Sequence, residues 1–113
     1  MKKLVLLSFM FISFFTEAVG TINCGTVTID SVYVQGDRQD GGLHANIMLI
    51  LLGSDKKDEC SDITYAYLEN DDDAYSGTLS MAIAAYMAGK KLRVQVEGTS
   101  AMNGAKRIAW VNF

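Results

Sequence analysis

The chain has 113 residues, no proline, and 10 Lys and Arg against 13 Asp and Glu. A chain of this length forms one domain with a modest core. Its acidic balance argues against nucleic acid and against an anionic membrane as the partner.

The N-terminal segment has the three parts of a secretory signal peptide. Lys2 and Lys3 provide the charged start, and residues 4–15 form an apolar stretch of twelve residues. That stretch is shorter than the roughly 20 residues of a membrane-spanning helix. Small residues follow it, so we expect a signal peptide at 1–20 with cleavage after Gly20, or alternatively after Ala18.

Export would place the domain in the periplasm or outside the cell, with no membrane insertion after cleavage. Loss of Lys2, Lys3 and Glu17 would leave 8 basic and 12 acidic residues in a single domain over 21–113, a net charge of −4. A lipoprotein anchored at Cys24 is the alternative, but residues 21–23 lack the features of a lipobox.

Two cysteines follow the predicted cleavage site, Cys24 and Cys60. An even pair in an oxidising compartment predicts a disulfide. A redox or metal site would need a C-x-x-C motif or nearby histidines, and the sequence has neither.

Three strands are predicted in the first half of this domain. In Gly25–Gln35 the apolar phase slips by one residue, which predicts a bulge or bend near Asp30 and Ser31. After the polar turn 36–42, Ala45–Leu52 is a strand that is apolar on both faces. Ile63–Glu69 alternates and ends at an acidic turn.

One helix and two strands are predicted in the second half. Ser76–Ala88 has helical periodicity, with Gly89 as its C-terminal cap and Lys90 and Lys91 where the helix dipole favours cations. Strands follow at Leu92–Glu97 and 106–113. The order β-β-β-α-β-β, with a bent first strand, predicts a mainly β domain with one helix. Its expected architecture is a five-stranded OB-fold-like Greek-key barrel rather than an open α+β sheet.

The predicted helix carries no charged residue between Asp73 and Lys90. Its larger apolar residues Leu79, Ile83, Tyr86 and Met87 are expected to face the sheet. A helix that is also apolar or small on its other face predicts a partner or a homo-oligomer. The expected contact residues are Ser80, Met81, Ala84, Ala85 and Ala88.

The segment Ala84–Val96, in which a helix ends on glycine and leads through basic residues into an alternating strand, resembles small secreted bacterial domains related to subtilase-cytotoxin B subunits. The resemblance implies an export signal, an OB barrel, one disulfide and a five-membered ring whose helices line a pore. The cysteines depart from that pattern, since Cys24 precedes the first predicted strand and Cys60 the third. The family's sugar-binding serine segment has no counterpart here, so no binding residue is carried over.

Candidate ligand residues cluster in the first turn, at a barrel rim where such folds place ligands. With Tyr33 or Trp110 as a stacking surface they could hold a sugar, although a plain exposed turn is the simpler interpretation. His44 beside Asp40 has no nearby nucleophile and is not a catalytic constellation. The candidates are Asp37, Arg38, Gln39, Asp40 and His44.

The acidic residues at 69–73 lack the spacing and the glycine of an EF-hand loop, so no metal and no cofactor are expected. The sequence predicts a non-enzymatic secreted binding module whose partner is a glycan or a protein. A monomeric inhibitor or immunity-type protein is the alternative.

Overall fold

The computed structural model describes residues 20–40, 45–98 and 104–113. The predicted signal peptide, apart from Gly20, and the candidate residue His44 lie outside these ranges. Within them the chain is mainly β-structure with one α-helix. The strands are β1 (Thr21–Val27), β2 (Ile29–Gln35), β3 (Ile47–Leu52), β4 (Tyr65–Glu69), β5 (Leu92–Glu97) and β6 (Ala105–Asn112). A short 3₁₀ helix, η1 (Asp58–Cys60), precedes β4, and the α-helix α1 (Tyr75–Ala88) connects β4 to β5.

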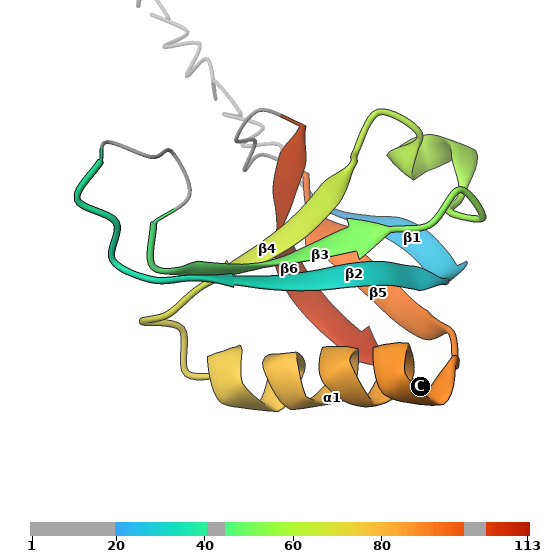
Figure 1. The fold of residues 1–113 in the computed structure, drawn as a ribbon. Coiled ribbons are helices and arrows are strands. Elements are labelled where there is room, and N and C mark those ends of the chain that lie inside the picture. Colours follow the sequence, from blue (N-terminus) through green and yellow to red (C-terminus); the bar gives the residue numbers. More distant parts are fainter. Residues whose placement is uncertain (1–19, 41–44, 99–103) are drawn as a thin grey trace, which may run out of the picture.

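The six strands form a sheet in the order β1-β5-β6-β4-β3-β2. Neighbouring strands are antiparallel except β4 and β6, which pair in parallel. The helix α1 lies on one side of the sheet alongside β2, and the C-terminal end of β6 also reaches it (Figure 1).

The prediction of five strands was wrong, because the first predicted strand is divided. It begins at Thr21 rather than Gly25, and it is interrupted at Thr28. The bulge predicted near Asp30 and Ser31 is confirmed by a register shift between Ile29 and Ser31. Because β1 and β2 are the two edges of the sheet order and only Thr28 separates them, both edges of the sheet meet at this residue.

Thr28 leaves the strand ladder because its polar groups are bound elsewhere. Its backbone N–H and its hydroxyl donate to the two carboxylate oxygens of Asp55, each at 2.9 Å. Its carbonyl accepts from the N–H of Gly53 at 2.8 Å. A Cβ on Gly53 would lie 2.9 Å from the Thr28 oxygen, so only glycine allows this approach. Lys91 Nζ lies 3.0 Å from Asp55 and ties the start of β5 to the same corner.

The strand β3 is buried on both faces, as its apolar run predicted. Met48, Ile50 and Leu52 belong to the main core, which lies between the sheet and α1. Ile47 and Leu49 point to the opposite face and join a second cluster with Tyr67 and Ala105. The central hairpins β2-β3 and β3-β4 are therefore fixed in register by apolar contacts on both sides.

The helix limits agree with the prediction to one residue, and Gly89 caps α1 in the left-handed conformation with φ 63°. The prediction of which residues of α1 face the sheet was wrong for most of the helix. Thr78, Ala82 and Ala85 are buried against the core, whereas Ile83, Tyr86 and Met87 are exposed. Small residues face inward because they let the helix approach the sheet closely.

Two of the predicted contact residues therefore require correction. Ala85 is fully buried in the core and cannot contact a partner. Met81 is half-buried and packs against the same core. Ser80, Ala84 and Ala88 are exposed, as expected for an outward face.

The predicted disulfide between Cys24 and Cys60 is present, and both residues are completely buried. Cys24 lies within β1 rather than before it, beside a register shift between Asn23 and Gly25. The Lys57 N–H donates to the Cys24 carbonyl at 3.0 Å, which adds a second link between β1 and the segment of η1. The bridge thus fastens an edge strand to the loop before β4.

Loss of the bridge should lower stability substantially. The cysteines are 36 residues apart, and closing such a loop in the unfolded chain contributes about 3.8 kcal/mol in the chain-entropy model. The Cys24→Ala/Cys60→Ala double variant should therefore lose about 3 to 4 kcal/mol in urea unfolding. A reductant should produce a similar loss in the parent chain and none in the variant. Equal stability of the two proteins would contradict this account.

Asp55 should make stability depend on pH. The Thr28 backbone N–H, with Lys91 and the Thr28 hydroxyl, lowers the pKa of Asp55 from 3.8 to about 2 against the opposing effect of burial. A carboxyl whose pKa is lowered on folding stabilises the fold at pH values above its pKa in the unfolded chain. This contribution is lost as the pH falls from about 4 through 2. Asp55→Asn should cost about 1 kcal/mol at pH 7, allowing for exposure.

The cost of Asp55→Asn should shrink toward zero by pH 2, as measured by denaturant unfolding across this pH range. Asp62→Asn changes an exposed carboxyl outside the corner and is the matched control. The same cost at pH 2 and pH 7 would show that the ionised carboxylate does not stabilise the corner.

Candidate functional site

A groove of about 330 Å³ lies on the face of β2, β3 and β4 that is opposite to the main core. It is lined by Tyr33, Gln35, Leu49 and Tyr65, and we call it the tyrosine groove. Strand alternation places these four residues on one face, since Tyr33 is paired with Leu49 and Leu51 is paired with Tyr65.

The two tyrosines form the walls of this groove. Their ring centroids are 6.2 Å apart at an interplanar angle of 71°, which is an edge-to-face arrangement. Tyr33 is 43% exposed, whereas Leu49 is buried beneath the rings. The groove therefore presents aromatic surface to solvent over an apolar floor.

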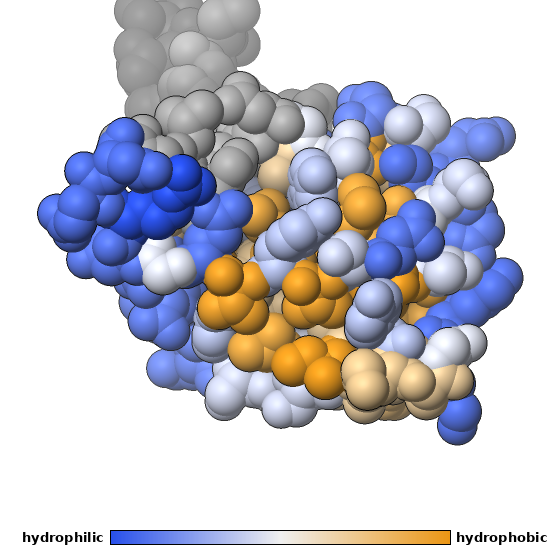
Figure 2. Space-filling view, viewed as in Figure 1, coloured by the Kyte–Doolittle hydropathy of each residue, from blue (hydrophilic) through white to orange (hydrophobic). Residues whose placement is uncertain are grey.

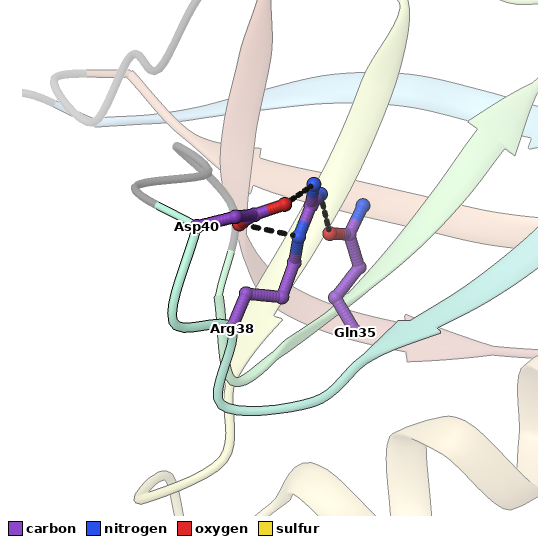
Figure 3. A network of polar contacts seen from close by, with 3 residues as sticks. All are labelled: Gln35, Arg38 and Asp40. Atoms are coloured by element: carbon purple, nitrogen blue, oxygen red, sulfur yellow. Dashed lines mark hydrogen bonds and ion pairs between the residues drawn. The ribbon is translucent and has the colours of Figure 1, made fainter.

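Gln35 is the polar group of the groove, and the turn after β2 fixes its orientation (Figure 3). Arg38 Nη1 donates to Gln35 Oε1 at 2.9 Å. The same guanidinium donates to both carboxylate oxygens of Asp40, through Nε at 3.1 Å and Nη2 at 2.7 Å. A bidentate pair of this kind holds the planar guanidinium in one orientation, so the Gln35 amide is held in turn.

The structure places some of the predicted ligand residues at the tyrosine groove and others away from it. Arg38 and Asp40 are brought together at the rim of the tyrosine groove, and Tyr33 lines the groove itself. Asp37 and Gln39 are exposed in the same turn but do not line the groove.

Trp110 is not part of the tyrosine groove. The guanidinium of Arg93, on β5, lies 5.5 Å from the centre of the ring of Trp110, on β6.

The sequence did not identify three residues of the groove, Gln35, Leu49 and Tyr65. The alternation of the predicted third strand already placed Tyr65 on one face, but only the register shows that this face also carries Tyr33.

A second groove, of about 500 Å³, lies between the N-terminal half of α1 and β6. Its floor is apolar and includes Met81, Ile108 and Trp110, and Asp72 and Asp73 are at its edge. We call it the helix groove.

The carboxylate of Asp72 is occupied by the fold. Its Oδ1 accepts from the Ala74 N–H at 2.9 Å, and its Oδ2 accepts from Arg107 Nη2 at 2.6 Å. Burial acts to lower the pKa of Arg107, but the charges of Glu97 and Asp72 outweigh it and raise that pKa above its ordinary value. The acidic turn therefore anchors the start of α1. In the described ranges, no three His, Cys, Asp or Glu side chains gather as metal ligands would.

The exposed side of α1 is apolar or small along its whole length. Figure 2 shows hydrophobic residues gathered where α1 and β2 lie side by side, bordered by hydrophilic residues. Met87 is 76% exposed and Val34 of β2 is 59% exposed. Side chains of this size are seldom left uncovered together unless they contact a partner.

Nowhere in residues 20–40, 45–98 and 104–113 does a helix combine the length and the apolar character needed to cross a membrane. Comparison of the chain with protein-family models, with curated proteins and with solved structures finds no match.

Proposed function

We propose that this domain is an OB-fold-like barrel that binds a neutral glycan in the tyrosine groove, and that it acts after export, in the periplasm or outside the cell. The barrel is supported by the strand order. When β1 and β2 are counted as one bent strand, five strands remain, and the two edges of the sheet meet at Thr28. The helix between β4 and β5 also has the place that an OB-fold gives it.

The observation that carries the glycan proposal is the lining of the groove. A sugar ring has a face of C–H groups that packs on aromatic rings, and a rim of hydroxyls that pairs with planar amides. Tyr33 and Tyr65 supply the aromatic surface, and Gln35 supplies an amide already held by Arg38. A pocket with an apolar lining and a few oriented polar groups is typical of small-ligand sites.

The charge at the groove favours a neutral sugar over an acidic one. The four described lining residues are uncharged at neutral pH, and the adjacent Arg38 is paired with Asp40 at 2.7 Å. An anionic sugar would have to compete with Asp40 for that guanidinium. Because glycoside hydrolysis uses two carboxyl groups at the sugar and none lines the groove among the described residues, we propose binding without catalysis.

The disulfide supports the proposed location. Cys24 and Cys60 form a completely buried bridge, and structural disulfides of this kind are typical of oxidising compartments. The proposal of export through the signal peptide at residues 1–20 accounts for that compartment.

Removal of either groove tyrosine should weaken glycan binding. Tyr33→Ala and Tyr65→Ala should each reduce affinity by up to about tenfold, because a stacking surface is worth about 0.5 to 1.5 kcal/mol beyond its buried area. A glycan array of neutral and sialylated structures identifies the ligand, and titration calorimetry with that glycan measures the loss.

Tyr86→Ala is the matched control, since Tyr86 is about as exposed as Tyr33 but lies on α1. It should leave the affinity unchanged. Absence of binding across the array, or an equal effect of all three substitutions, would reject the tyrosine groove as a glycan site and favour a protein partner.

Loss of Arg38 should have a smaller effect on the same binding. Arg38→Ala frees the Gln35 amide to rotate, so we expect affinity to fall by a few-fold, on the order of one exposed hydrogen bond. Gln35→Leu should lose at least as much, because the amide itself is removed. A larger loss from Arg38→Ala than from Gln35→Leu would show that Arg38 contacts the sugar directly.

A further inference from the structure

We infer that two copies of this chain pair through α1 in antiparallel orientation, about a two-fold axis near the middle of the helix. This inference does not depend on glycan binding. It rests on the size of the exposed residues along α1 and on the charges of the residues just beyond its two ends.

The outward side of α1 is small in its first half and large in its second half. Gly77 and Ser80 are exposed near its start, and the Ser80 hydroxyl is satisfied by the Ser76 carbonyl at 2.8 Å. Ile83 and Met87 are exposed near its end. Ser80, Ala84 and Met87 follow one another at the helical spacing of three to four residues, so they form one continuous ridge.

An antiparallel neighbour would place the large half of one helix on the small half of the other. With the axis between Ser80 and Ala84, Met87 of each copy lies over Gly77 of its partner. The small residues at the centre allow the two helices to approach closely. A parallel pair would instead set Met87 against Met87 and leave a gap at Gly77.

Charge gives the same orientation. The described helix is uncharged from Tyr75 to Ala88, with acidic residues before it and basic residues after it. Asp71 and Asp73 are exposed at the first end and Lys90 is exposed at the second. The ion pairs within the described residues involve none of these three side chains. Antiparallel pairing sets acid against base at both ends, whereas parallel pairing sets like charges together.

The charged residues are well placed for such contacts because their backbone is held. Lys90 N–H donates to the Ala85 carbonyl at 2.9 Å, which fixes the chain as it leaves the helix. At the other end, the Asp72 N–H donates to the Glu69 carbonyl and the Tyr75 N–H to the Asp72 carbonyl, each at 3.0 Å. The side chains at both ends therefore extend from ordered positions.

A pair of 14-residue helices gives a small interface, so the dimer should dissociate in the micromolar range. Sedimentation velocity over a concentration series should show monomer and dimer in exchange, using the full chain purified in the form that the cell produces. Met87→Glu should yield monomer at every concentration. A parent chain that stays monomeric at all concentrations, or that forms a larger ring, would overturn the inference.

Charge reversal tests the orientation. Asp73→Lys and Lys90→Asp, made separately, each place like charges opposite each other at both ends of the two-fold pair, and each should weaken the homodimer by about tenfold. Mixed in equal amounts, the two variants should form a heterodimer as strong as the parent dimer. The double variant should also recover, because its charges are exchanged at both ends. Failure of both combinations to recover would exclude antiparallel pairing.

The two proposals can fail separately. Tyr33→Ala should leave the dimer intact, and Met87→Glu should leave glycan affinity per chain unchanged. Circular dichroism of each variant shows whether it has folded. Loss of dimer in Tyr33→Ala would mean that the tyrosine groove, rather than α1, forms the interface, and this would also overturn the inference.

Discussion

The fold depends on the hydrogen bonds that hold Thr28 at the corner between β1 and β2. The Asp55 carboxylate accepts both donors of Thr28, and Gly53 donates to its carbonyl. These bonds satisfy the backbone groups of a residue that has left the sheet ladder, which would otherwise be costly. Since Lys91 reaches the same carboxylate, one side chain fixes the turn of the first strand and the entry to β5. The first strand can then be divided into β1 and β2 at Thr28 while both parts stay attached to the same corner.

Much of the architecture could be predicted from the sequence, because its signals are local. The alternation of β5, the double-faced run of β3 and the glycine cap of α1 all have the predicted type and nearly the predicted limits. The disulfide was predicted from the two cysteines together with a predicted export signal. The division at Thr28 could not be predicted, because it depends on Asp55, a residue 27 positions away. The predicted orientation of α1 was wrong for a related reason. A helix that is apolar on all sides has no single apolar stripe to show which side faces the sheet, so close packing determines its orientation.

The candidate site also combines features that the sequence could predict with features that it could not. Arg38 and Asp40 are two residues apart, and their pairing was within reach of the sequence. The groove beside them joins residues of β2, β3 and β4, and its members share a face only because of the register of those strands. Strand alternation also places the tyrosine groove on the face opposite to the core on which α1 packs. The proposed glycan binding and the proposed dimer are therefore compatible, and such a dimer would present two grooves to a multivalent glycan.

The position of the disulfide has a consequence for the order in which the chain can fold. Its two cysteines both lie within the first 60 residues, and the loop that they close contains β2 and β3. Among the described strands β1 pairs only with β5, which does not begin until Leu92. A bridge between Cys24 and Cys60 can therefore hold β1 beside the β2-β3 hairpin before the C-terminal half of the chain has folded. When β5 folds, it pairs with an edge strand that is already held in place. The strand pairing between the segments most distant in sequence is then completed at a reduced entropic cost.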